Sequence, residues 1–328
     1  MPKRKPATMR WRSSALLRLA LLLPACAPFC APNAGRRARA RSVGTEAQVS
    51  TEAPADVEEP RMWPGWTKSV APNSTLLYMS FLEHQLGVLE AMGAKPVELE
   101  DRLQYATKTK NDAVGARVAS KVFKVEGLFR RVRMTYFDGG PSLQVFNSLW
   151  YPDFDRVDAP LLGIDLLAFG DKKLLCVVDA QPLRGRDEKT DGSAHATAAL
   201  AAVRAVEGRD ELRGSVSSRW YDDNCYFSKE MLYSRFEESG RQGIQAALQP
   251  AFEDYLAAYI DVVRNAPVDA GHADSAREAQ RVYDDFNAER DPAHGLFTSY
   301  FGEQWANDFV RDFLFKLSAP KEPHAPET

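Results

Sequence analysis

Apolar residues early in the chain recur with the spacing of a helix. From Ser74 to Gly93, large apolar side chains fall at intervals of three and four residues, which would place them on one face of a helix. Asn73 or Ser74 can cap its start, and Gly93 can end it. This spacing predicts an amphipathic helix over Ser74 to Gly93.

Between residues 121 and 183 the period changes to two, which predicts β-strands. In the run RRVRMTYFDGG, apolar residues alternate with Arg131, Arg133 and Thr135 before an Asp-Gly-Gly turn. The runs SLQVFNSLWYP, PLLGIDLLAFG and KLLCVVDAQPL are short, apolar and bounded by Pro or Gly, and Asp171-Lys172 predicts a tight hairpin between the last two. Together they predict an antiparallel meander of at least four strands, and their nearly continuous apolar character predicts that both sheet faces are covered.

Further helices follow the strands and supply the cover. They are predicted over Ala196 to Val206, Gln242 to Arg264, Ser275 to Glu289 and Phe301 to Phe315. A sheet enclosed by helices belongs to the α/β class. The predicted form is a three-layer α/β/α sandwich with a central antiparallel sheet.

Charge is distributed unevenly along the 328 residues. The net charge is −3, but residues 1–45 carry ten Lys or Arg and no acid, which leaves −13 on the rest. So acidic a body is a poor binder of nucleic acid. In the first 45 residues, an apolar run (Ala15 to Ala27) interrupted by Arg18 precedes the Arg-rich GRRARARS (Gly35 to Ser42). This composition is typical of a targeting leader.

The leader and the composition that follows define the predicted domain organisation. Residues 1–45 are interpreted as a bipartite signal and transit peptide, which would direct the protein to the plastid (chloroplast) of a secondary-plastid alga. A single mitochondrial or chloroplast transit peptide is the alternative. Residues 46–61, rich in Glu, Pro and Ala, are predicted to be a disordered linker. The folded domain is expected over residues 62–318 and a disordered tail over 319–328.

Cysteine and glycine patterns argue against a bound cofactor. Cys26 and Cys30 lie in the predicted leader, and Cys176 and Cys225 have no CxxC partners or neighbouring His pair. The sequence has no HExxH, GxSxG, GxGxxG or P-loop motif. No metal site, hydrolase triad or nucleotide site is therefore predicted.

Three polar residues occupy positions where their chemistry needs an explanation. Asp165 lies in the apolar run LLGIDLL, where desolvation would raise its pKa toward that of a proton donor. The alternative interpretation is an Asp that caps a turn or pairs with an Arg. Asn147, in QVFNSLW, could hold a polar ligand group or bridge neighbouring strands as a buried amide. Asp291 precedes a Pro and is, by itself, typical of an N-cap or turn.

Four short motifs occur in order between Ser142 and Leu183. They are an aromatic-Pro strand end, a D-x-P tripeptide, a G-x-D strand and a closing D-x-Q-P-L, here Trp150-Tyr151-Pro152, Asp158-Ala159-Pro160, Gly163-Ile164-Asp165 and Asp179-Ala180-Gln181-Pro182-Leu183. In these motifs, and in the C-terminal run from Tyr283 to Phe315, the chain resembles the ferredoxin-dependent bilin reductases. The resemblance covers about Trp63 to Leu317.

The resemblance implies an α/β/α sandwich that holds a bilin between the sheet and the C-terminal helices. It implies an oxidoreductase acting on CH–CH groups, with no bound cofactor, that takes single electrons from an external reduced 2Fe–2S ferredoxin and passes through bilin radicals. Asp165 matches the strand acid that protonates the bilin, and Asp291 matches the acid on the opposite, C-terminal side. Lys229 matches a basic position that holds a propionate. Asn147 stands where the branch that makes phycocyanobilin has His, which argues against that product.

The motifs around Asn147 look most like the branch of 15,16-dihydrobiliverdin:ferredoxin oxidoreductases. That branch reduces the C15=C16 bridge of biliverdin IXα, the first step of phycoerythrobilin biosynthesis among the phycobilin pathways. A phycoerythrobilin synthase, which shares the Asn and both Asp residues, and a phycoerythrobilin:ferredoxin oxidoreductase are alternatives. A bilin carrier or lyase is the alternative outside the family.

The implied partners are biliverdin IXα, ferredoxin, and the next bilin reductase or a phycobiliprotein lyase, with no nucleic acid and no membrane for the mature protein. Because plant-type ferredoxins are acidic like this body, docking should need a local basic patch. Its candidates are Lys121, Lys124, Arg130, Arg131, Arg133, Lys172 and Lys173.

Overall fold

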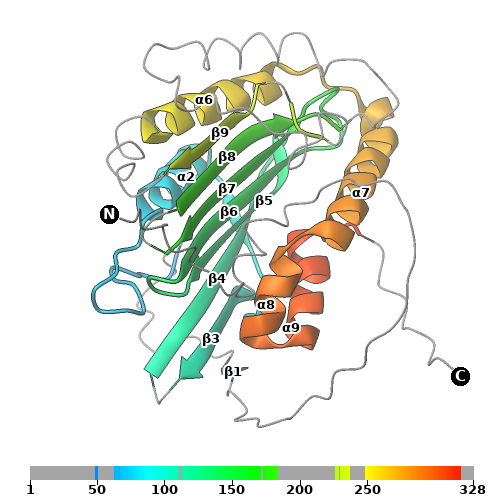
Figure 1. Ribbon diagram of the computed structural model, residues 1–328. Helices are drawn as coiled ribbons and strands as arrows, with labels where there is room; N and C mark the ends of the chain where they lie inside the picture. Colours follow the sequence, from blue (N-terminus) through cyan, green and yellow to red (C-terminus); the bar gives the residue numbers. More distant parts are fainter. Residues whose placement is uncertain are drawn as a thin grey trace, which may run out of the picture.

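The computed structural model describes residues 49–50, 63–110, 113–170, 173–183, 226–228, 230–236 and 248–318. Within these ranges, nine strands form one antiparallel sheet in the order β1-β3-β4-β5-β6-β7-β8-β9, with β2 also pairing with β4 (Figure 1). The strands are β1 (Val49–Ser50), β2 (Lys95–Val97), β3 (Tyr105–Lys110), β4 (Ala113–Val125), β5 (Phe129–Asp138), β6 (Leu143–Pro152), β7 (Leu161–Phe169), β8 (Lys173–Gln181) and β9 (Leu232–Phe236). The helices are α2 (Met79–Ala91), α3 (Asp101–Gln104), α6 (Gln249–Asn265), the 3-10 turn η4 (Ala270–His272), α7 (Ala273–Arg290), α8 (Ala293–Phe301), α9 (Glu303–Asp308) and the π-helical turn η5 (Phe309–Leu314).

The centre of the sheet is the predicted meander. Strands β5, β6, β7 and β8 each pair with the next in antiparallel register, so the predicted α/β class and central antiparallel sheet are confirmed. The alternation on β5 places Val132, Met134 and Tyr136 in the core of one face. Arg131 and Arg133, one residue out of phase, point to the other face and are also buried.

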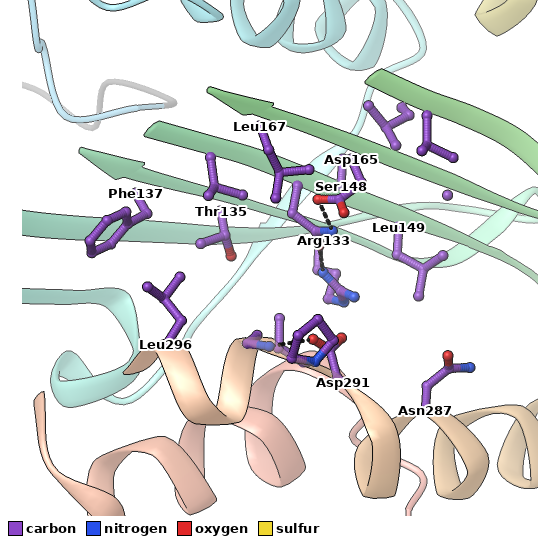
Figure 2. Close-up of a pocket in the computed structure, with 18 of the residues that line it drawn as sticks. Arg133, Thr135, Phe137, Ser148, Leu149, Asp165, Leu167, Asn287, Asp291 and Leu296 are labelled. Carbon is purple, nitrogen blue, oxygen red and sulfur yellow. Dashed lines mark hydrogen bonds between the residues drawn. The ribbon is translucent and has the colours of Figure 1, made fainter. Parts of the chain in front are cut away.

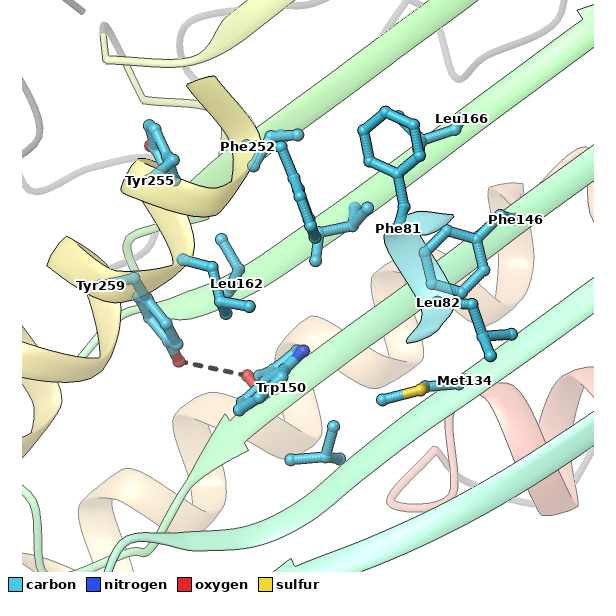
Figure 3. Packing of buried hydrophobic residues seen from close by; sticks show 14 of the residues in the cluster. Phe81, Leu82, Met134, Phe146, Trp150, Leu162, Leu166, Phe252, Tyr255 and Tyr259 are labelled. Atoms are coloured by element: carbon cyan, nitrogen blue, oxygen red, sulfur yellow. Dashed lines mark hydrogen bonds between the residues drawn. The ribbon is translucent and has the colours of Figure 1, made fainter. Parts of the chain in front are cut away.

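Helices cover both faces of the sheet (Figure 1). On one face, α2 and α6 pack over the strands, and Phe81 and Phe252 meet edge to face with ring centroids 5.2 Å apart (Figure 3). Burial of each such side chain stabilises the fold by about 1.5–3 kcal/mol. The opposite face is covered by α7, α8, α9 and η5, which share a second apolar cluster with the strands. The two clusters enclose the sheet as predicted.

The first helix is shorter than its apolar pattern predicts. It begins at Met79 rather than Ser74, because the preceding residues are tied to the sheet instead. The Gln144 side chain of β6 accepts a hydrogen bond from the Leu77 backbone N–H (3.0 Å) and donates to the Thr75 carbonyl (2.7 Å). The Thr75 carbonyl, which a longer helix would use for its first intrahelical bond, is thus bonded to the sheet.

The predicted helix over Phe301 to Phe315 is confirmed over most of its length, as α9 and the π-helical turn η5 from Glu303 to Leu314. Phe301 itself ends the preceding helix α8, and Gly302, with φ of +91°, a conformation that L-residues avoid, separates α8 from α9. The hairpin of β3 and β4 was not predicted. Val49–Ser50, within the segment predicted to be a linker, pair with β3.

Several predictions fall outside the described residues. These include the leader over 1–45, the helix over 196–206, residues 242–247 and the tail over 319–328. The turn residues Asp171 and Lys172 also lie outside, but β7 and β8 pair in antiparallel register up to Phe169 and Lys173, as the predicted hairpin requires. In the described ranges, no helix has the length and apolar character needed to cross a membrane.

Candidate active site

A cavity lies between the sheet and the C-terminal helices (Figure 2). The space between the two walls is about 1200 Å³ when the solvent-filled mouth is included. Strands β5 to β8 form one wall, and the end of α7, α8 and η5 form the other. Much of the lining is apolar, including Val145, Leu149, Leu167, Leu296, Phe297, Phe309, Leu314 and Phe315. Such walls weaken the solvation of any charged group between them.

Asp165 and Asn147 lie side by side on the sheet wall. They are directly opposite each other in the β6–β7 register, and Asn147 Nδ2 donates to Asp165 Oδ1 at 3.2 Å. The oxygen of the same amide accepts a hydrogen bond from Arg133 Nη1 on β5, at 2.5 Å. Asn147 therefore bridges neighbouring strands, as its alternative interpretation predicted, and it also lines the cavity. Asp165 stands in mid-strand beside an amide, not at a turn or against an Arg.

The Asp165 carboxyl has the protonation behaviour predicted from its apolar surroundings. Burial raises its pKa from 3.8 to about 7. The hydrogen bond from Asn147 and the charge of Arg133 oppose this rise, while the charge of Asp291 adds to it. A carboxyl that titrates near neutral pH can donate a proton to a bound molecule and be reprotonated from solvent.

Asp291 approaches the cavity from the opposite wall, at the junction of α7 and α8 (Figure 2). Its Oδ1 accepts the Ala293 backbone N–H at 2.7 Å, the cap-like contact that its position before Pro292 predicted. Burial raises the pKa of Asp291, and the Ala293 N–H, Arg133 and His294 act in the lowering direction. The structure thus brings Asp165, Asn147 and Asp291 to one cavity.

The G-x-D and D-x-Q-P-L motifs meet on the sheet wall of this cavity. A Cβ atom at Gly163 would lie 2.9 Å from Gln181 Nε2, so glycine leaves the space that the Gln181 amide fills. Gln181 in turn accepts a hydrogen bond from the Tyr283 hydroxyl of α7, at 2.5 Å. The two motifs therefore fix the approach of α7 to the sheet, and with it the wall that carries Asp291.

Sequence reasoning did not identify six polar lining residues, namely Arg133, Thr135, Ser148, Gln181, Tyr283 and Asn287. For Arg133 a signal was present, because an Arg that alternates with apolar residues in a strand covered on both faces must be buried. Arg133 and Arg131 were instead proposed as ferredoxin-docking residues, and both are buried (2% and 6% exposed), so that part of the predicted patch is wrong. Tyr283 and Asn287 could not be connected with the sheet without the fold.

The predicted propionate-binding Lys229 lies outside the described residues. The residue before it, Ser228, is bonded to the sheet: its backbone N–H and hydroxyl both donate to Asp179 of β8, at 2.9 and 2.5 Å. Phe227 lines the cavity. In the described ranges, no three His, Cys, Asp or Glu side chains form a group suited to a metal ion.

Comparison with known proteins identifies the family to which a chain with this fold and cavity belongs. The family model described as ferredoxin-dependent bilin reductase matches residues 83–316. The chain therefore belongs to the ferredoxin-dependent bilin reductase family and is an oxidoreductase of that class.

Among individual relatives, it is similar to the 15,16-dihydrobiliverdin:ferredoxin oxidoreductase of Synechococcus sp. strain CC9902, with 38% identity over 74% of this chain and 99% of that protein. The protein of the same name from Gloeobacter violaceus is 37% identical over 74% of this chain and 97% of its own length. The crystal structure of tomato phytochromobilin synthase in complex with biliverdin shares the fold, with a TM-score of 0.58, 21% identity, and coverage of 73% of this chain and 83% of that one.

Proposed function

We propose that this protein reduces biliverdin IXα at the C15=C16 bridge to 15,16-dihydrobiliverdin, an early step of phycoerythrobilin biosynthesis. The observation that carries the proposal is Asp165, an acid with a pKa of about 7 on the wall of the cavity between the sheet and the C-terminal helices. The similarity to 15,16-dihydrobiliverdin:ferredoxin oxidoreductases along nearly their whole length supports the choice of bond.

The reaction adds two electrons and two protons to the bilin. The electrons come one at a time from an external reduced 2Fe–2S ferredoxin, so each electron gives a radical that a proton can trap. Asp165, on the sheet wall of the cavity, is proposed to supply a proton to the C15=C16 bridge of the bilin. Asn147 holds the carboxyl but cannot itself donate an acidic proton, because an amide only donates and accepts hydrogen bonds.

An anaerobic assay tests this reaction. Protein, biliverdin IXα, ferredoxin and a ferredoxin-reducing system are mixed, and the products are separated by chromatography. We expect the reaction to stop at the two-electron product 15,16-dihydrobiliverdin, even with excess reductant. If biliverdin remains unchanged while added 15,16-dihydrobiliverdin is consumed, the protein is a phycoerythrobilin:ferredoxin oxidoreductase. A bound spectrum without turnover would identify a bilin carrier or lyase.

A four-electron phycoerythrobilin synthase is the second candidate, and Asp291 could support its second reduction. This acid lies on the wall opposite Asp165, where it could protonate a different part of the same pigment. Accumulation of phycoerythrobilin in the same assay would support this candidate over the first.

We also propose a plastid location, supported by the basic, acid-free composition of residues 1–45 and the Arg-rich GRRARARS segment. Residues 1–45 fused to a fluorescent protein should direct it to the plastid in an alga with secondary plastids. Accumulation in mitochondria would instead support the single transit peptide alternative.

A further inference from the structure

Arg133 is the one Lys or Arg among the described residues that line the cavity. Its side chain extends from β5 toward the helical wall that bears Asp291 (Figure 2), yet the residue is only 2% exposed. Nη1 donates to Asn147 Oδ1, whereas Nε is buried without a hydrogen-bond partner in the described ranges. A buried guanidinium with an unpartnered N–H is costly to the fold. Arg131 shares this feature, so what distinguishes Arg133 is its place on the cavity wall and its hydrogen bond to Asn147.

The contact with Arg133 determines which way the Asn147 amide faces. A guanidinium has only donors, so the amide oxygen must face Arg133, and the amide NH₂ must then face Asp165. Asp165 Oδ1 is thereby engaged as an acceptor. When Asp165 is protonated, its proton is carried on the other oxygen, Oδ2.

The charges around Asp165 give Arg133 a second influence on this acid. The cavity walls hold two carboxyl groups, Asp165 and Asp291, and Arg133 acts on the pKa of both in the lowering direction. The groups facing Asp165 are Arg133 on β5, Asn147 on β6 and Asp291 at the end of α7, with Cys176 on β8 and Tyr78 before α2 interacting with it from the other side of the sheet. Arg133 is the cation of this set.

We propose that Arg133 is a positioning residue of the reaction: through Asn147 it fixes the orientation of the Asp165 carboxyl and directs the acid proton to Oδ2. This role depends on the proposed proton transfer from Asp165. Arg133 does not contact the reacting carbon in this scheme. It sets the direction of two successive hydrogen bonds, from Arg133 on β5 to Asn147 on β6 and from Asn147 to Asp165 on β7.

Three single variants of the full chain separate this role from a structural one. Arg133→Met removes the charge and the donor with little change of length, and Arg133→Lys keeps both. Arg131→Met is the matched control, because Arg131 is also buried on the same face of β5 but donates to the Phe313 carbonyl and is not among the lining residues. Thermal unfolding identifies any variant that does not fold.

The first measurement is a pH titration of the Asp165 carboxyl by infrared difference spectroscopy, using each protein against the same protein carrying Asp165→Asn. We expect a midpoint near pH 7 for the wild type, about one unit or more higher for Arg133→Met, and unchanged for Arg133→Lys and Arg131→Met. An Arg133→Met midpoint equal to that of the wild type, or an equal shift in Arg131→Met, would overturn the proposal.

The second measurement is the rate of biliverdin reduction against pH. Arg133→Met should lower kcat by about 10- to 100-fold with little change in KM, and should move the alkaline limb of the profile to higher pH. Arg133→Lys should restore both. A rise in KM alone would overturn the proposal, because it would make Arg133 a substrate-binding residue. The titration uses no bilin, so failure of the wild type to reduce biliverdin would refute the proposed function without altering the infrared result.

Discussion

An Asp165→Asn variant should be more stable than the wild type at about pH 8, although the two should be nearly equal at about pH 4. Burial raises the pKa of Asp165 from 3.8 to about 7, and in the unfolded chain the carboxyl returns to its ordinary value. Because the folded-state value is the higher one, the stability associated with the neutral acid is fully present below about pH 4 and is lost as the pH rises through about 7. Asn has nearly the shape of the neutral acid and does not titrate.

The magnitude follows from the shift in pKa. A change of about three units corresponds to an upper limit of about 4 kcal/mol in the free energy of unfolding. Asp165 lines a cavity that opens to solvent, and water entering the cavity would reduce this penalty. We therefore expect the variant to gain about 2 kcal/mol over the wild type between about pH 4 and pH 8.

Urea unfolding across this pH range measures the difference directly, from the midpoint and slope of each curve. Other groups titrate equally in both proteins and cancel from the comparison. Glu98→Gln, at an exposed position after β2, is the matched control and should show no pH-dependent difference from the wild type. A pH-independent difference for Asp165→Asn, or one that turns against the variant as the pH rises, would refute the assigned titration of Asp165.

Three further outcomes are expected. Asp165→Asn should bind biliverdin with an altered absorption spectrum but turn over about 10²- to 10⁴-fold more slowly, and wild-type turnover would contradict its role as proton donor. Gly163→Ala should lower the free energy of unfolding by about 1–3 kcal/mol, because its Cβ would displace the Gln181 amide, whereas Gly87→Ala in α2, with open space around it, should be neutral or slightly stabilising in the same urea assay. Asp291→Asn should still yield 15,16-dihydrobiliverdin by chromatography, and loss of this product would show that both acids serve the first reduction.

The sheet could be predicted from sequence because its strands carry their own pattern. The alternation of apolar residues with Arg131 and Arg133 defined the β5 faces, and the apolar run containing Asp165 defined a strand covered on both sides. A carboxyl within that run could be recognised as desolvated without coordinates, because its neighbours in sequence are also its neighbours in space.

Features that depend on distant contacts could not be predicted. The start of α2 is set by Gln144, which lies far along the chain, and the end of α8 is set by the backbone angle of Gly302. The sequence predicted Asp291 to be a cap or turn residue, and its local contact, the hydrogen bond from the Ala293 N–H, is of that kind. Only the packing of α7 and α8 against the sheet shows that the same carboxyl faces a cavity.

The alternation of faces along β6 has an evolutionary consequence. Phe146, Ser148 and Trp150 point toward α2 and α6, where Trp150 and Ser148 both donate to Gln85, while Asn147 between them points into the cavity. Neighbouring residues of β6 are therefore under different constraints. Those that face α2 and α6 must preserve the packing of the sheet, whereas the residue at position 147 must preserve the chemistry of the cavity. A substitution at position 147 can change proton delivery without disturbing the layer that stabilises the sheet. Enzymes of such a family can therefore come to make different products through single replacements on the cavity face of a strand, while the packing of its other face stays the same.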